Sequence, residues 1–201
     1  MEINFSELSP AQAYFVMTQS IIPRPIAWVL SENQNQTFNL APYSFFNAIS
    51  SDPPLLMFSA GKRSEGTDKD SLTNIQRSGQ CVIHIATAEQ INQVHQTGTA
   101  LPPEQSEIDE YNIELTKFDG FALPRVKQAP IAFGCEFYKV DEIGNKPMSL
   151  VFVEIKQAYI DDAVASWVKE GRLKIDSQQL NPLARLGGLE YSSVGEVLQP
   201  D

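Results

Sequence analysis

The chain has 201 residues, 25 acidic and 15 basic side chains, a formal net charge of −10, and 42% hydrophobic residues. This composition is typical of a folded globular protein rather than a disordered or fibrous one. The acidic balance argues against a protein that tracks nucleic-acid phosphates or docks on an anionic membrane. A single domain over residues 1–201 is expected, because no repeat, low-complexity tract or linker-like stretch interrupts the sequence.

The sequence has no signal for secretion or membrane insertion, and it has few side chains that commonly act in catalysis. Met1 to Leu8 lack the basic and apolar regions of a secretory signal, and no apolar run approaches the roughly 18 residues of a membrane span. We therefore expect a cytoplasmic protein with Cys81 and Cys135 as reduced core thiols, although two cysteines also allow a disulfide. Only two His and two Cys are present, so no catalytic side chain is assigned.

In chain order, the first predicted element is a helix that runs from Pro10 to about Gln19. Ser9 is expected to cap it, with Pro10 at its first position and Gln12 completing a capping box. Apolar runs and alternation then predict strands over residues 26–30, 37–41 and 55–58. The polar residues 31–36 form the hairpin loop between the first two strands.

A second helix is predicted from Ser71 to Ser78, with Asp70 as its N-cap and Gly79 as its C-cap. A strand follows over residues 80–86. Thr87 then caps a short helical segment.

Residues 99–112 are Pro-rich and acidic, so they are expected to form a surface excursion. Two long strands follow over residues 131–143 and 149–160, separated by a turn at 144–147. Many strands without regular strand–helix alternation favour an antiparallel barrel over a doubly wound sheet.

Common site motifs are absent or incomplete in this sequence. Gly61 and Gly66 have the spacing of a P-loop, but Thr67 and Asp68 follow where that loop needs Lys and then Ser or Thr. Neither GxGxxG nor GxSxG occurs. Cys81 and His84 lie three residues apart on a predicted strand and so point to opposite faces. No metal site is assigned.

Hydrogen-bond donors gather between the strand that ends near residue 58 and the helix that begins near residue 71. They are Ser59, Lys62, Arg63, Lys69, Ser71 and Asn74. A helix N-terminus offers free amides and the positive end of a dipole, which suit a phosphate group when Lys and Ser side chains are near. A capped surface helix with solvated lysines explains the same residues, and both interpretations stay open on the residues alone.

Four motifs occur in a fixed order along the chain: Arg24-Pro-Ile-Ala27, Asn39-Leu-Ala-Pro-Tyr-Ser-Phe-Phe-Asn47, Ser51-Asp-Pro-Pro-Leu55 and Lys69-Asp-Ser-x-x-Asn-Ile75. Residues 129–135 and 182–188 continue the series. Their order and spacing resemble the flavin reductase-like, FMN-binding split-barrel family over about residues 15–195. The resemblance implies a mainly β fold, a six-stranded antiparallel split β-barrel with short peripheral helices. It also implies a homodimer with one non-covalent FMN per subunit near the dimer interface.

The same resemblance implies the cofactor-binding residues. Those facing the isoalloxazine ring and ribityl chain would be Arg24, Pro25, Ile26, Ala27, Asn39, Ala41, Pro42, Tyr43 and Ser44. Those holding the phosphate would be Ser59, Lys62, Lys69 and Ser71, with Asp70 capping the helix and Asn74 supporting the loop. Pro25 and Pro42 fix φ and lack an N–H, which leaves neighbouring amides free for the flavin. Arg185 and Tyr191 would either reach the partner subunit's flavin or pack in the dimer or core.

The activity that the resemblance implies is that of an FMN-dependent oxidoreductase. NAD(P)H would reduce the flavin, which would pass electrons to free flavin, oxygen or another small-molecule or protein acceptor. Such chemistry needs no acid–base triad, in keeping with the few His and Cys. Two alternatives stay open: an FMN-binding electron carrier or flavin store without nicotinamide turnover, and a barrel whose flavin site has decayed.

Overall fold

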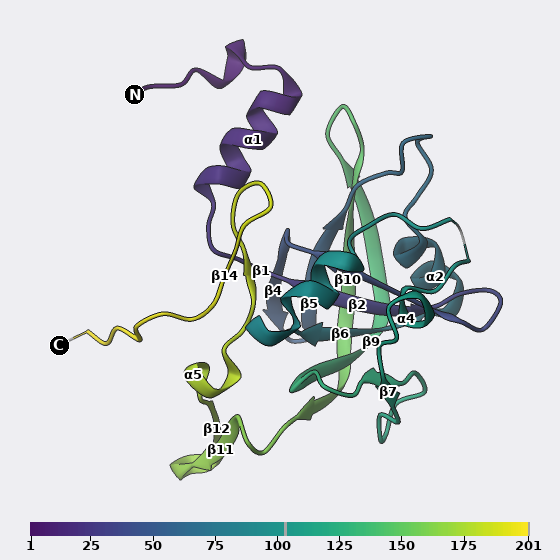
Figure 1. Ribbon diagram of the computed structural model, residues 1–201, viewed down its shortest axis with the longest axis vertical. Helices are drawn as coiled ribbons and strands as arrows, with labels where there is room; N and C mark the ends of the chain where they lie inside the picture. Colours follow the sequence, from purple (N-terminus) through teal and green to yellow (C-terminus); the bar gives the residue numbers. More distant parts are fainter. Residues whose placement is uncertain (103, 201) are drawn as a thin grey trace.

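The computed structural model describes residues 1–102 and 104–200, and an antiparallel sheet of seven strands forms its body (Figure 1). Its strands lie in the order β3-β2-β6-β9-β10-β5-β4. Their bounds are β2 (Ala27–Glu32), β3 (Phe38–Tyr43), β4 (Phe46–Ser51), β5 (Pro54–Ala60), β6 (Gln80–Ile85), β9 (Ile131–Ile143) and β10 (Met148–Ile160). The mainly β split-barrel fold is as predicted, but six strands is wrong for this sheet. The strand that the sequence analysis missed is β4, whose exposed edge position gives it no buried apolar face.

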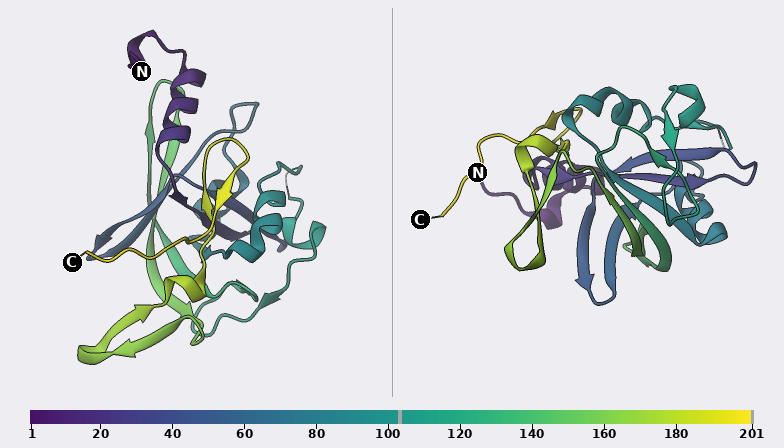
Figure 2. Two further views of the ribbon diagram at one scale, coloured as in Figure 1. Left: turned by 60° about the vertical axis from the view of Figure 1, so that its left-hand side comes forward. Right: turned by 90° about the horizontal axis from the view of Figure 1, so that it is seen from below.

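Shorter elements surround this sheet (Figure 2). Three small ladders are formed by β1 (Arg24–Pro25) with β13 (Ala184–Arg185) and β14 (Tyr191–Ser192), by β7 (Leu115–Thr116) with β8 (Arg125–Val126), and by β11 (Ala165–Val168) with β12 (Arg172–Ile175). The helices are α1 (Pro10–Ser20), α2 (Asp70–Ser78), α3 (Ile91–Gln96), α4 (Glu107–Glu110) and α5 (Ser177–Leu180), with 3₁₀ turns η1 (Phe5–Glu7), η2 (Ala88–Gln90) and η3 (Lys169–Gly171). Among the described residues, no helix has the length and hydropathy needed to cross a bilayer.

Side-chain packing closes the barrel across strands that are not hydrogen-bonded to each other. The rings of Tyr43 on β3 and Phe58 on β5 lie 4.8 Å apart, although these strands are not neighbours in the sheet. Strand β2 is buried on both faces, with Trp28 and Leu30 in one core cluster and Val29 in the other. This double burial explains why the sequence there reads as a continuous apolar run rather than an alternation.

The helix caps agree with the sequence analysis at most positions. Ser9 and Gln12 form the predicted capping box at the start of α1, and Gly79 ends α2 with a φ of 75°, in the left-handed region that favours glycine. The prediction that Asp70 caps α2 is wrong, because the cap residue is Lys69 and Asp70 is the first helical residue. The Asp70 carboxylate pairs with Arg63 instead.

The prediction of a surface excursion at residues 99–112 holds only in part, and residue 103 lies outside the described residues. Residues 99, 100, 102, 104 and 105 are exposed, but the later part of the segment packs against the core. This segment contains α4, which Ser106 caps by accepting a hydrogen bond from the Asp109 amide. Glu107 and Ile108 are buried, and Ile108 belongs to the core cluster around Trp28. A helix of four residues is too short for apolar periodicity to show in the sequence.

Cys81 and His84 point to opposite faces of β6, as predicted. Cys81 is a register partner of Cys135 on β9, and both are buried free thiols. The hydrogen bond with Cys81, followed by burial, raises the pKa of the Cys135 thiol. On the other face, burial lowers the pKa of His84 to about 4, and its Nε2 accepts a hydrogen bond from the Val126 amide. His84 is therefore a neutral core residue.

The buried indole of Trp28 makes one polar contact that the fold depends on. Its Nε1 donates to the Thr97 Oγ1 over 2.9 Å. We expect Thr97→Val to lower the free energy of unfolding by about 1–2 kcal/mol, because the indole N–H would stay buried without an acceptor. Urea unfolding measures this, with Thr99→Val at an exposed position as the matched control. Equal stability of the two variants would contradict the expectation.

Candidate functional site

Two adjoining cavities form a groove beside β3 and the start of α2. The inner cavity has a volume of about 270 Å³, and its polar lining includes Asn39, Tyr43, Lys62, Arg63, Lys69, Asp70, Ser71 and Glu107. The outer cavity has a volume of about 470 Å³, and its lining includes Tyr14, Phe15, Arg24, Ile26, Ser44, His95, Arg185 and Tyr191. Both cavities share Pro42, Gly98 and Thr99 as a common wall.

The floor of the inner cavity joins β3 to the first turn of α2. The buried Ser71 Oγ accepts a hydrogen bond from Asn39 Nδ2 over 2.9 Å, and Ser71 also bonds to the Tyr43 hydroxyl. Burial raises the pKa of Tyr43 to about 12, so the phenol stays protonated. Three residues that the sequence analysis assigned to the flavin site are thus brought together, and Ala41 lines the same cavity.

The three cations of the inner cavity differ in what they contact. Lys62 Nζ lies 2.6 Å from Asp68 and also pairs with Glu142, and Arg63 pairs with Asp70. Among the described residues, Lys69 has no carboxylate within 4.0 Å. Lys69 is also the N-cap of α2 and makes no side-chain capping bond. The Leu72 and Thr73 amides donate to the Lys69 carbonyl, which leaves the Asp70 and Ser71 amides to other partners. This end of the cavity fits an anionic group such as a phosphate.

A buried carboxyl group that the sequence analysis did not assign also borders the inner cavity. Glu107 is 5% exposed, and its Oε2 accepts a hydrogen bond from the Leu40 amide over 2.9 Å. Burial raises the pKa of Glu107 to about 7, against the opposing effect of that hydrogen bond. Ser106 and Asp109 carry a helix-cap signature, but no sequence spacing reveals that the carboxyl beside them is buried.

Four of the residues assigned from the sequence lie outside the described cavity walls. Ala27 is buried in the core and Pro25 is exposed, while Ser59 lies on β5 with its amide bonded to the Phe45 carbonyl. Asn74 is buried and donates to Asn33 Oδ1 over 2.7 Å, so it supports the 31–36 turn rather than the cavity.

Arg24 lines the outer cavity and donates mainly to the backbone, although its Nε also donates to the Ser44 hydroxyl over 3.4 Å. Its Nη1 donates to the Thr18 and Ile21 carbonyls over 2.6 and 2.9 Å, and its Nη2 donates to the Leu186 carbonyl over 2.9 Å. The guanidinium therefore ties the end of α1 to the segment between β13 and β14, which lie side by side in Figure 1.

Arg185 and Tyr191 line the outer cavity of their own chain, together with Arg24 and Ser44. Arg185 Nη1 donates to the Tyr191 hydroxyl over 2.6 Å, and His95 Nδ1 lies 3.3 Å from the same oxygen. The sequence analysis assigned no role to His95, and no motif marks it. Its contact with Tyr191 depends on the short β1-β13-β14 ladder, which fixes residues 184–192 beside residues 24–25.

A family model described as a flavin reductase like domain matches residues 18–172. The chain belongs to this family. Among solved structures, it is 29% identical to nitrilotriacetate monooxygenase component B from Bacillus cereus, with a TM-score of 0.90 and coverage of 100% of this chain and 98% of that one. It is 30% identical to 2-nitrobenzoate 2-nitroreductase from Pseudomonas fluorescens, with a TM-score of 0.86 and coverage of 100% and 95%.

A relative in Bacillus subtilis, the uncharacterized protein YwrF, is 30% identical over 194 residues, which cover 94% of this chain and 93% of that protein. The solved relatives include oxidoreductases with different named reactions. Membership of the flavin reductase-like family therefore establishes a flavin-binding class of fold and an oxidoreductase family.

Proposed function

We propose that the chain binds FMN in the groove and acts, as a single-domain cytoplasmic homodimer, as an NAD(P)H-dependent oxidoreductase. The observation that carries this proposal is the open N-terminus of α2 beside Lys69, at one end of a groove formed by two joined cavities. Lys69 and Ser71 would hold the phosphate, and Pro42, Ser44 and the outer cavity would border the ring. When bound, the flavin supplies the hydride chemistry, passing electrons from NAD(P)H to free flavin, oxygen or another small-molecule or protein acceptor.

The residues of the chain would bind and orient the cofactor rather than exchange protons with it. The buried Asn39, Tyr43 and Ser71 network is held by hydrogen bonds across β3 and α2, so the site is formed before a ligand arrives. The pKa of Tyr43 near 12 keeps its hydroxyl a neutral hydrogen-bonding group at physiological pH. The net charge of −10 gives no reason to propose a nucleic-acid or membrane partner.

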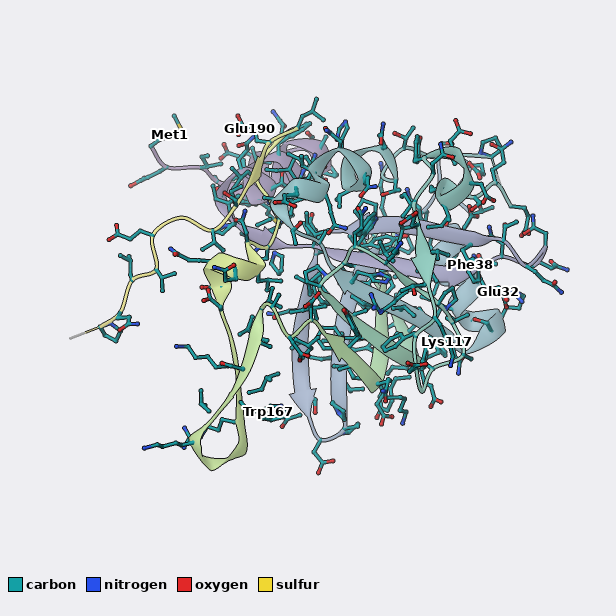
Figure 3. All side chains as sticks on the ribbon, turned by 60° about the horizontal axis from the view of Figure 1, so that its bottom comes forward. Met1, Glu32, Phe38, Lys117, Trp167 and Glu190 are labelled. Carbon is teal, nitrogen blue, oxygen red and sulfur yellow. The ribbon has the colours of Figure 1, made fainter. Side chains whose placement is uncertain are left out.

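Exposed apolar side chains support the proposed homodimer. Trp167 on the β11–β12 hairpin is 75% exposed, and its arm stands away from the barrel (Figure 3). Val168 and Leu173 on the same hairpin and Ile49 on the edge strand β4 are exposed as well. Trp167 and Leu173 are register partners and so lie together, and contiguous exposed apolar patches commonly mark protein interfaces.

Anaerobic stopped-flow mixing with NADH or NADPH tests the proposed reaction. We expect at least one donor to bleach the visible absorbance of FMN-loaded protein faster than it bleaches free FMN at the same concentration, because binding orients the two reactants. Failure of both donors to bleach the bound flavin faster than free FMN would contradict the proposed reaction and favour the carrier or flavin-store alternative.

A further inference from the structure

Two arginines lie opposite each other in a strand ladder and line the outer cavity. Arg24 and Arg185 are register partners of the antiparallel β1–β13 ladder, and like charges directly opposite in such a ladder destabilise it. The pKa of Arg24 is lowered, mainly by burial and to a smaller extent by the charge of Arg185, against the opposing effect of Tyr14. Among the described residues, neither guanidinium has a carboxylate within 4.0 Å.

Only neutral groups satisfy these two arginines. Arg24 donates to three backbone carbonyls and the Ser44 hydroxyl, while Arg185 donates to the Tyr191 hydroxyl and the Gly188 carbonyl. The protein therefore places two adjacent positive charges against a cavity without a neutralising acid, in a chain whose net charge is −10. An oxyanion in that cavity would offset the repulsion, and guanidinium groups bind carboxylates through paired hydrogen bonds.

The rest of the outer cavity wall is aromatic. Tyr14 and Phe15 on α1 line it and are 51% and 59% exposed. Tyr191 lines it as well, with the Arg185 guanidinium carbon 4.5 Å from its ring centroid. Such rings suit a flat aromatic ligand, which stacks on them or meets their edges. Figure 3 labels Glu190, the residue before Tyr191 in the chain, and shows that this segment lies beside α1.

We propose that the outer cavity binds a planar aromatic carboxylate, with its carboxylate toward Arg185 and Arg24 and its ring against Tyr14 and Phe15. This deepens the proposed function by naming a ligand class for the same groove. The ligand's place beside a flavin rests on that function, whereas the binding itself does not. Four of the five N–H groups of Arg24 already donate, to three carbonyls and the Ser44 hydroxyl, so the pair has donors for one compact oxyanion rather than for the longer pyrophosphate of a dinucleotide.

Titration calorimetry of the flavin-free protein with benzoate tests the proposal. We expect saturable benzoate binding. Benzamide lacks the negative charge and sulfate lacks the aromatic ring, so each should bind about tenfold more weakly or worse. Arg185→Gln is expected to weaken benzoate binding at least about tenfold. Arg185→Lys keeps the positive charge but loses the paired N–H donors of the guanidinium. Its affinity for benzoate should therefore lie between those of the wild type and Arg185→Gln. Arg77→Gln removes the same charge outside both cavity walls and should bind benzoate like the wild type.

Melting temperatures of the variants establish that each one is folded before its affinity is compared. The proposal is wrong if benzoate does not saturate the wild type, if both Arg185 variants bind it unchanged, or if sulfate binds as tightly. It is also wrong if Arg185→Gln weakens FMN binding and leaves benzoate binding intact, because the guanidinium would then serve the flavin. A protein that binds benzoate but not FMN would instead overturn the proposed function and leave this inference standing.

Discussion

Lys69→Gln is expected to weaken FMN binding by about 10- to 100-fold. Lys69 is a cation of the inner cavity with no carboxylate within 4.0 Å among the described residues, and it lies at the uncapped start of α2. A hydrogen bond to a charged group contributes about 1.5–3 kcal/mol, which corresponds to that change in affinity. Quenching of FMN fluorescence during titration of the flavin-free protein measures the dissociation constant.

Lys62→Gln provides the matched control, because it removes the same charge from the same cavity. The Lys62 ammonium already contacts Asp68 and Glu142, so we expect its loss to change FMN affinity by less than about threefold. Lys69→Gln with wild-type affinity, or a larger loss in Lys62→Gln, would show that the phosphate is not held at the start of α2.

Glu107→Gln is expected to make the flavin-free protein more stable above pH 7 and to leave its stability unchanged near pH 4. Burial raises the pKa of Glu107 from the usual 4.5 to about 7. A carboxyl whose pKa is raised by folding contributes stability that is fully present below pH 4.5 and is lost as the pH rises through 7. The shift corresponds to a difference of up to about 3 kcal/mol in the free energy of unfolding.

The glutamine amide oxygen can still accept the Leu40 N–H bond, so the variant removes the titrating charge without orphaning that amide. Urea unfolding of both proteins between pH 4 and pH 8 gives the difference directly. Glu110→Gln, at an exposed position of the same helix, should show no such trend. A constant difference between Glu107→Gln and the wild type across this range would mean that Glu107 does not titrate as its burial requires.

Local sequence signals predicted the elements whose structure depends mainly on their own residues and close neighbours in the chain. Ser9, Pro10 and Gln12 define the start of α1 through bonds within four residues of each other, and Gly79 ends α2 because it can adopt a positive φ. The buried run at β2 and the long β9–β10 pair carry enough apolar residues to be recognised as strands.

Elements fixed by distant contacts were missed. Strand β4 is an exposed edge, and β1, β13 and β14 have two residues each, so none shows a hydrophobic period. Lys62 and Lys69 look alike in sequence, yet only the fold brings Glu142 to Lys62, 80 residues away. The burial of Glu107 and the contact of His95 with Tyr191 likewise depend on tertiary packing.

Calorimetric titration of the flavin-free protein with FMN and with riboflavin tests the central claim, that the groove holds a flavin by its phosphate. The account predicts one FMN per chain and riboflavin binding at least about tenfold weaker, because riboflavin lacks the group that Lys69 and the start of α2 would contact. No binding of FMN, or equal affinity for the two flavins, would contradict it.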